Sequence, residues 1–145
     1  VPGCVDTAQF DLPITQAEAR RKLQLPQGRP IVLAVRRLVR RMGLEDLIDA
    51  AGLGEHVKLL GFVPDEHLAA LYRAATVSVV PTVALEGFGL ITVESLASGT
   101  PVLVTPVGGL PEAVSGLSEE LVLGGTGTAA IAQGLDGALS GTLKL

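Results

Sequence analysis

The stretch TVSVVPTVALEGFGLITVESLASGTPVLVTPVGG (residues 76–109) decides the fold class of this chain. It contains two short apolar runs, Val77–Val80 and Pro101–Val104, with the length and composition of buried strands. Between them, the segment from about Gly89 to Ser98 is predicted to form a helix. Two parallel strands need a crossover of a dozen or more residues, usually a helix. The stretch therefore predicts a βαβ unit.

The flanking sequence continues the alternation of strands and helices. Thr15 and Glu18 have capping-box spacing and predict a helix that ends near Gln24, and Ile31–Val35 is a β-branched run typical of a buried strand. We also predict helices at 44–51, 65–72, 111–114 and 128–139, strands at 57–60 and, weakly, 121–123, and irregular chain at 1–12. This order predicts an α/β protein with a Rossmann-like, doubly wound parallel sheet.

Composition and charge narrow the classes of function. The 145 residues predict one domain (1–145), and the net charge of −4 argues against nucleic acid as a partner. The single cysteine, Cys4, cannot form an internal disulfide, and no signal peptide opens the chain, so we expect a cytoplasmic location. His56 and His67 have no metal-ligand partners at suitable spacing, so no metal site is predicted.

Ligands of doubly wound sheets bind beyond the carboxyl ends of the strands. The loops at 36–43, 61–64, 81–88 and 105–109 are therefore the places where we expect a site. The first of them holds the basic run Arg36–Arg41, and no G-x-G-x-x-G motif is present there, which argues against a nicotinamide dehydrogenase. Arginine suits a diphosphate because its planar fork donates two hydrogen bonds. The alternative is a solvated cluster that pairs with Glu45 and Asp46.

Two acids flank the predicted start of the helix at Gly89. Glu86 lies just outside the helix and Glu94 lies inside it, and both can accept hydrogen bonds from hydroxyls. The free N–H groups and partial positive charge of the helix start form a natural phosphate seat. A ligand with hydroxyl, phosphate and hydroxyl groups in a row, such as a nucleotide sugar, would satisfy all three features. The alternative makes Glu86 a dipole partner and Glu94 a solvated helix residue.

The segment LEGFGLITVESLASGTPVLVTPVGGLPEAV closely resembles the donor-binding signature of retaining nucleotide-sugar glycosyltransferases of GT-B fold (glycosyl transferases group 1, family 4). The E-x7-E motif of that family corresponds to Glu86 and Glu94. The segments VPGCVDTAQF, VRRLVRRMGLEDLIDA and LLGFVPDEHLAALYRAATVSVVPT resemble further landmarks of its C-terminal domain, in the same order. The resemblance implies the C-terminal, donor-binding half of such an enzyme, with an N-terminal acceptor domain absent.

The resemblance also implies roles for individual residues. Arg37 would hold the donor diphosphate, Glu86 would contact the donor sugar in the catalytic centre, and Glu94 would bind the ribose hydroxyls. Further donor contacts are implied for the backbone of Phe62 and Val63 at the base, for Gly87, Phe88 and Gly89 at the sugar, and for Leu90 and Ile91 at the phosphate. The family needs no cofactor and no bound metal, because cationic side chains and helix amides stabilise the leaving nucleoside diphosphate.

The chain departs from the family at two places that matter for the site or the sheet. Met42 stands where the family usually has lysine, and we expect Arg41 to supply the missing charge. Between Ala50 and Leu53 the family normally has a further strand and helix, about 30 residues. Deleting a central strand would leave unpaired backbone groups, so we expect that the chain lacks residues of the full-length protein at this point.

These observations predict retaining hexosyl transfer by the full-length protein and donor binding without transfer by these 145 residues. The acceptor is left open between a lipid, a sugar and a small metabolite, and any membrane association would come from the absent N-terminal domain. Two alternatives also stay open. One is a nucleotide-sugar 2-epimerase of the same fold, and the other is a non-catalytic module that binds a nucleotide sugar.

Overall fold

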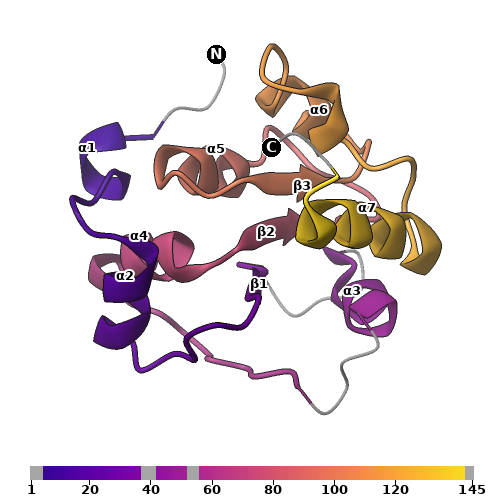
Figure 1. Cartoon of the computed structure of the whole chain (residues 1–145). Helices are drawn as coiled ribbons and strands as arrows, with labels where there is room; N and C mark the ends of the chain where they lie inside the picture. The colour runs from indigo at the N-terminus through magenta and orange to yellow at the C-terminus, as the bar shows by residue number, and fades with distance from the viewer. Residues whose placement is uncertain (1–4, 37–41, 52–55, 143–145) are drawn as a thin grey trace.

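The computed structural model describes residues 5–36, 42–51 and 56–142. Its centre is a parallel sheet of three strands in the order β1 (Val32–Leu33), β2 (Val77–Val80) and β3 (Val102–Val104) (Figure 1). In the register, Leu33 lies opposite Ser78, and Ser78 lies opposite Val102. The predicted α/β class and parallel sheet are confirmed.

Helices cover both faces of the sheet. They are α1 (Thr7–Phe10), α2 (Gln16–Lys22), α3 (Leu44–Ala51), α4 (Asp65–Ala74), α5 (Leu90–Ala97), α6 (Leu110–Ala113) and α7 (Thr128–Ser140), with a 3₁₀ turn η2 (Glu119–Leu121). Helices α3 and α7 pack on each other on one face, whereas α5 packs against β2, β3 and α4 on the other, and α2 packs on α4 (Figure 1). In the described part of the chain, no helix is long and apolar enough to cross a membrane.

The strands are apolar throughout because both faces of the sheet are buried. Val79 and Leu103 face the core beneath α3 and α7, together with Ile131. Val80 and Val104 point to the opposite face. Each of these side chains is at most 1% exposed, and full burial of one such side chain contributes about 1.5–3 kcal/mol.

Ser78, the polar residue of β2, fixes α5 to the sheet. Its Oγ lies 2.6 Å from the Oγ of Ser95 on α5, and Ser95 also bonds the carbonyl of Thr100 at 2.9 Å. Both serine side chains are buried. Because buried hydroxyls need partners, this contact sets the position of α5 along the sheet, and with it the position of the residues at the helix start.

Three local predictions were wrong. The segment 57–60 forms no strand: the described outer edge of β1 pairs with nothing, and Leu59 is 71% exposed. Apolar composition does not make a strand without a ladder partner. At 121–123 the chain forms η2 and a single bridge between Val104 and Val122. Within the stretch expected to be irregular, Asp6 caps α1 by accepting from the amide of Ala8.

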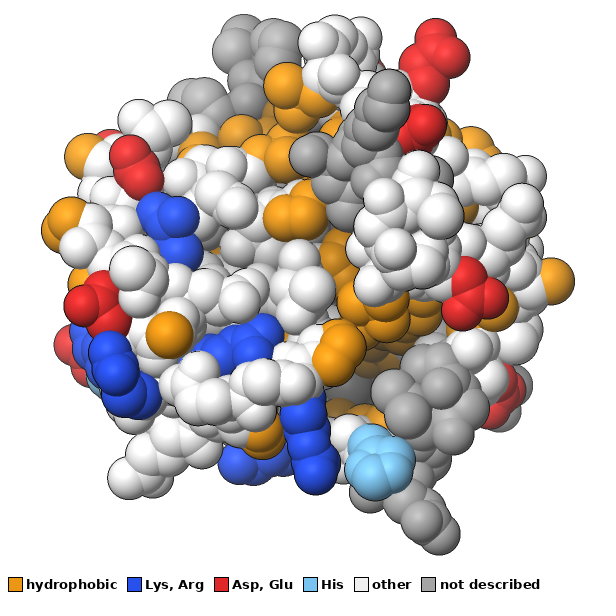
Figure 2. All heavy atoms as spheres, in the orientation of Figure 1, with side chains coloured by type: hydrophobic (Ala, Val, Ile, Leu, Met, Phe, Trp, Pro, Cys, Tyr) orange, Lys and Arg blue, Asp and Glu red, His pale blue; other side chains and the backbone are white. Residues whose placement is uncertain are grey.

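The edge of the sheet at β1 lies next to an apolar surface. On the face shown in Figure 2, hydrophobic side chains lie in a hollow below α7. Val32 and Ala34 are half-buried and pack against the core under α3 and α7. The expected gap after Ala50 falls at 52–55, outside the described residues, and stays a prediction.

Gly43 brings the loop after β1 against the end of β2. Its φ is +73°, and a Cβ there would lie 1.8 Å from the carbonyl oxygen of Pro81. Gly28 has a similar φ of +71° with nothing within 4 Å, so it is a matched control. We expect Gly28→Ala to cost about 1–2 kcal/mol for the left-handed backbone alone. Gly43→Ala should cost about 1–3 kcal/mol more, because it also overpacks the site.

The measurement is the free energy of unfolding of both variants in denaturant. Equal losses of stability for Gly28→Ala and Gly43→Ala would contradict the close approach of the two loops.

Candidate functional site

The loops at the carboxyl ends of β2 and β3 are joined by hydrogen bonds. The amide of Gly109 donates to the carbonyl of Gly87 at 2.8 Å, and the hydroxyl of Thr105 donates to the carbonyl of Thr82 at 2.6 Å. A Cβ at Gly108 would lie 2.0 Å from the carbonyl oxygen of Glu86, so only glycine fits there. The predicted loops 81–88 and 105–109 therefore form one surface.

Glu86 is held by a buried ion pair. Nη2 of Arg36, from the chain after β1, lies 2.5 Å from Oε2 of Glu86 and 2.5 Å from the hydroxyl of Thr82. Thr82 in turn donates to the same Oε2 at 2.8 Å. The side chains of Arg36 and Glu86 are only 4% and 14% exposed. Arg36 also contacts the sulfur of Met42, so a cation does lie beside the position where lysine was expected.

These contacts decide the charge of Glu86. Burial alone raises the pKa of Glu86, but hydrogen bonds from Thr82 and Arg36 and the charge of Arg36 outweigh it, so the pKa lies below its usual value. The folded protein therefore gains stability from Glu86 above its unfolded pKa, and this gain is lost as the pH falls through the lower folded value. At neutral pH Glu86 is an anion that accepts hydrogen bonds.

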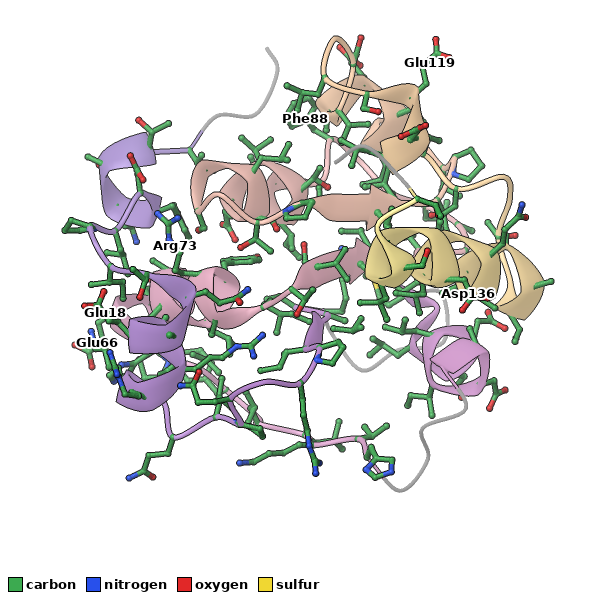
Figure 3. All side chains as sticks on the ribbon, viewed as in Figure 1. Glu18, Glu66, Arg73, Phe88, Glu119 and Asp136 are labelled. Atoms are coloured by element: carbon green, nitrogen blue, oxygen red, sulfur yellow. The ribbon has the colours of Figure 1, made fainter. Side chains whose placement is uncertain are left out.

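The start of α5 lies next to Glu86. Gly89 caps it in a left-handed conformation with φ +74°, and a Cβ there would lie 2.4 Å from Cδ2 of Leu110. The amides of Leu90 and Ile91 are in the first turn, where a helix offers no acceptor one turn back. Phe88 lies beside α6 (Figure 3). The helix thus presents donor groups one loop away from the Glu86 carboxylate.

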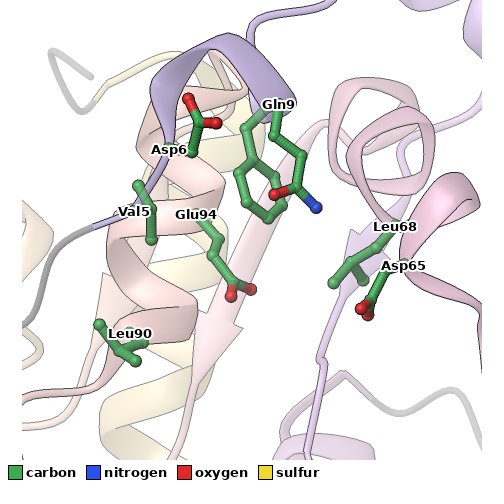
Figure 4. A pocket seen from close by; sticks show the side chains of 8 residues that line it. Val5, Asp6, Gln9, Asp65, Leu68, Leu90 and Glu94 are labelled. Carbon is green, nitrogen blue, oxygen red and sulfur yellow. The ribbon is translucent and has the colours of Figure 1, made fainter.

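Glu94 extends from α5 into a pocket of about 290 Å³ between α1, α4 and α5 (Figure 4). The hydroxyl of Tyr72 donates to Oε2 of Glu94 at 2.9 Å, and the buried Tyr72 ring packs edge-on against Phe10. The pocket is lined by Val5, Asp6, Gln9, Phe10, Asp65, Leu68, Leu90 and Glu94. Three of these side chains are carboxylic acids and none is basic, which suits a neutral ligand with many hydroxyl donors.

Glu94 has the opposite titration behaviour from Glu86. Burial raises the pKa of Glu94, the hydrogen bond from Tyr72 offsets part of this, and the charge of Asp65 adds to the rise. The contribution of Glu94 to stability is therefore fully present below its unfolded pKa and is lost as the pH rises through the folded value. Burial and Glu94 raise the pKa of Tyr72, while Arg36 acts to lower it.

The structure brings several of the predicted residues together. Glu86, Gly87 and Gly89 lie in the joined loops, and Leu90 lines the pocket of Glu94. Neither acid is a solvated residue, since Glu86 and Glu94 both have buried partners. Phe62 is 90% exposed and its neighbour Val63 is half-buried, at the chain before α4. Arg37 and Arg41 lie outside the described residues, so their predicted roles stay predictions.

Sequence reasoning missed three residues of the site. Arg36 was seen only as part of a basic run, and the structure pairs it with Glu86 and not with Glu45 or Asp46. Tyr72 was predicted only as part of the helix at 65–72. Thr82 had one signal, its place directly after the Pro81 that ends β2. In the described residues, no group of three His, Cys, Asp or Glu side chains could hold a metal ion.

Comparisons with known proteins agree with one another. A sequence model of the family described as "Glycosyl transferases group 1" matches residues 44–144. D-inositol 3-phosphate glycosyltransferase from Thermobifida fusca (strain YX) is 50% identical over 82 residues. Sucrose-phosphate synthase from Thermosynechococcus elongatus superposes with a TM-score of 0.85 at 31% identity. Anabaena HepE, solved in complex with UDP-glucose, superposes with a TM-score of 0.81 at 22% identity, which shows a shared fold alone.

All three proteins are longer than the part that matches. The match covers 56% of this chain and 19% of the T. fusca protein. The structural matches cover 97% of this chain and 43% of the sucrose-phosphate synthase chain, and 95% and 46% in the HepE comparison. The chain therefore corresponds to one part of a longer architecture in each of them.

The two neighbours of Glu94 should shift its titration in opposite directions. Tyr72→Phe removes a hydrogen bond that favours the carboxylate, so we expect the pKa of Glu94 to rise further. Asp65→Asn removes a like charge, so the pKa should fall. The measurement is ¹³C NMR of the Glu94 carboxyl group against pH, with Glu94→Gln to assign the signal. Shifts in the same direction for both variants would contradict this account.

Proposed function

The chain belongs to the glycosyl transferases group 1 family, and from this premise we propose that it binds the nucleotide-sugar donor for retaining transfer of a hexosyl group. One observation carries the proposal. An ionised acid held by Arg36 lies next to the exposed start of α5, and Leu90 at this start also lines the pocket of Glu94.

The donor sugar is assigned to Glu86. A carboxylate that stays ionised accepts hydrogen bonds from sugar hydroxyls, and Gly87 beside it leaves room for a close approach of the ligand to the backbone. The diphosphate is assigned to the amides of Leu90 and Ile91, because a helix start favours anions. Arg37 and Arg41 are the proposed cationic partners of the same diphosphate.

The nucleoside is assigned to the pocket at Glu94. The rise along a helix is 1.5 Å per residue, so Glu94 lies about 6 Å along the axis from Leu90. A diphosphate at the helix start would therefore have its ribose within reach of Glu94, with the base near Phe62 and Val63. HepE, which shares the fold, was solved in complex with UDP-glucose, and this supports a nucleotide sugar as the class of ligand.

The proposed chemistry depends on electrostatics. Transfer releases a nucleoside diphosphate, and its growing negative charge is stabilised best by donors that are already in place. The helix amides and the arginines of the first loop would supply this stabilisation without a cofactor. The acceptor, whether lipid, sugar or small metabolite, would bind to a further N-terminal domain. We assign no nucleophile, and the anomeric configuration is proposed to be retained.

The two acids should bind different parts of the donor. Glu94→Gln should lower the affinity for both UDP and UDP-glucose by about 10- to 150-fold. This factor corresponds to the free energy of one hydrogen bond to a charged group. Glu86→Gln should weaken UDP-glucose by a similar factor and leave UDP unchanged, because only the sugar reaches it. Isothermal titration calorimetry measures both affinities, with GDP- and ADP-sugars tested in parallel for the wild-type chain.

Glu66→Gln on α4 is the matched control, because its exposed side chain lies away from the pocket. If Glu86→Gln and Glu94→Gln lost equal affinity for UDP, the assignment of sugar and ribose to different acids would be contradicted.

The chain should bind donor without transferring sugar. We expect no transfer by the 145 residues alone in an assay with radiolabelled nucleotide sugars, because no acceptor site is assigned to them. In the full-length protein, Glu86→Gln should abolish transfer while the fold stays intact by circular dichroism. Measurable transfer by the 145-residue chain would contradict the first expectation. Unchanged transfer by full-length Glu86→Gln would contradict the catalytic role of Glu86, and no transfer by the full-length wild-type protein would favour a non-catalytic binding module.

A further inference from the structure

Arg36 is a buried cation whose described partners lie inside the site. Its side chain is 4% exposed, and Nη2 contacts the Glu86 carboxylate, the Thr82 hydroxyl and the Met42 sulfur. We infer that Arg36 is a positioning residue for Glu86: together with Thr82 it occupies Oε2 and leaves hydroxyl recognition to Oε1. This inference rests on the proposed function, because it concerns how the same site binds the donor sugar.

The hydrogen-bond geometry restricts the Glu86 carboxylate to one face. A carboxylate oxygen has two lone pairs, and Oε2 accepts from both Arg36 and Thr82. Arg36 and Thr82 follow the ends of two different strands, so the carboxylate cannot turn without breaking contacts to both. The other oxygen, Oε1, is therefore presented to a ligand from a fixed position.

Burial of the ion pair makes it unfavourable for Arg36 to move away from Glu86. Met42 is 8% exposed and covers the guanidinium, and Gly43 holds the following chain against the carbonyl of Pro81. Moving Arg36 away would leave the half-buried Glu86 without its counter-charge, which is unfavourable in a site of low polarity. The arrangement therefore holds Glu86 ionised and oriented before any ligand arrives.

The charged groups around Glu86 are few within the described chain. The strand end after β1 contributes Arg36, the chain after β2 contributes the neutral Thr82 and the amide of Gly87, and loop 105–109 carries no ionisable side chain. On α5 the ionisable side chain is Glu94, which accepts a hydrogen bond from Tyr72 of α4. Arg36 is therefore the charge that sets the ionisation of Glu86 among the residues described.

The first experiment measures the titration of Glu86 directly. ¹³C NMR of the carboxyl group is followed against pH in the wild-type chain and in Arg36→Met, Arg36→Lys and Thr82→Val, with Glu86→Gln to assign the signal. Arg36→Met should raise the midpoint by about one pH unit or more, the usual effect of losing a cation within contact distance. Arg36→Lys should restore part of the difference, and Thr82→Val should give a smaller rise.

Arg73→Met is the matched control. Arg73 also pairs with an acid and bonds a carbonyl, Asp11 at 3.1 Å and Leu12 at 2.9 Å, and it lies beside α1 (Figure 3). It should leave the Glu86 midpoint unchanged. If Arg36→Met fails to fold, Arg36→Lys and Thr82→Val still decide the question. An unchanged midpoint in every folded variant at Arg36 and Thr82 would overturn the inference.

The second experiment separates a positioning role from a merely structural one. The tightest-binding donor among UDP-glucose, GDP-mannose and ADP-glucose is compared with its nucleoside diphosphate by calorimetry. Arg36→Met should remove most of the sugar-dependent gain in affinity, at least tenfold, as Glu86→Gln does, and Arg36→Lys should recover part of it. A shifted titration with an unchanged sugar-dependent gain would overturn the inference.

The two readouts keep the inference distinct from the function on which it rests. If the wild-type chain binds none of these nucleotide sugars, the proposed function fails. The titration of Glu86 then still shows whether Arg36 holds the carboxylate ionised, and an unchanged midpoint would overturn that role independently.

Discussion

The parallel direction of β1, β2 and β3 is the constraint on which the site depends. It brings the carboxyl ends of all three strands to one edge of the sheet, so that residues distant in sequence become neighbours. Arg36 and Glu86 are 50 positions apart and form a buried ion pair there. The loops after β2 and β3 are joined by backbone hydrogen bonds at the same edge. Helix α5, fixed to the sheet through Ser78 and Ser95, then places its own start within this group.

The two acids of the site have opposite pKa shifts because their surroundings differ. Glu86 has a cation and a hydroxyl donor, which together outweigh the effect of burial and lower its pKa. Glu94 has a neutral hydroxyl donor and a nearby acid, so burial prevails and its pKa rises. As the pH falls, Glu94 is therefore protonated before Glu86. At a pH between the two pKa values, the proposed sugar and nucleoside sites would therefore contain acids of different charge.

Met42 shows how the local environment changes the meaning of one substitution. A lysine was expected at this position from the resemblance, and its absence implied the loss of a phosphate contact. In the structure, Met42 is buried and its sulfur lies against the guanidinium of Arg36, which is directed to Glu86. The cation beside position 42 is therefore Arg36, from the chain after β1, and its charge is paired with Glu86. Whether Arg41 also contributes stays a prediction, because it lies outside the described residues.

The sequence by itself determined the βαβ order, the capping box at Thr15, the start of α5 at Gly89 and the spacing of the two acids. These are local features, because they depend on periodicity, turn residues and capping within a few positions. Only the tertiary structure decided that 57–60 lacks a strand partner, that Tyr72 bonds Glu94 and that Arg36 is the cation at Glu86. The physical reason is that pairing and burial depend on contacts between segments far apart in the chain. A local pattern shows that a side chain is charged or apolar, but its partner is set by the packing of strands and helices.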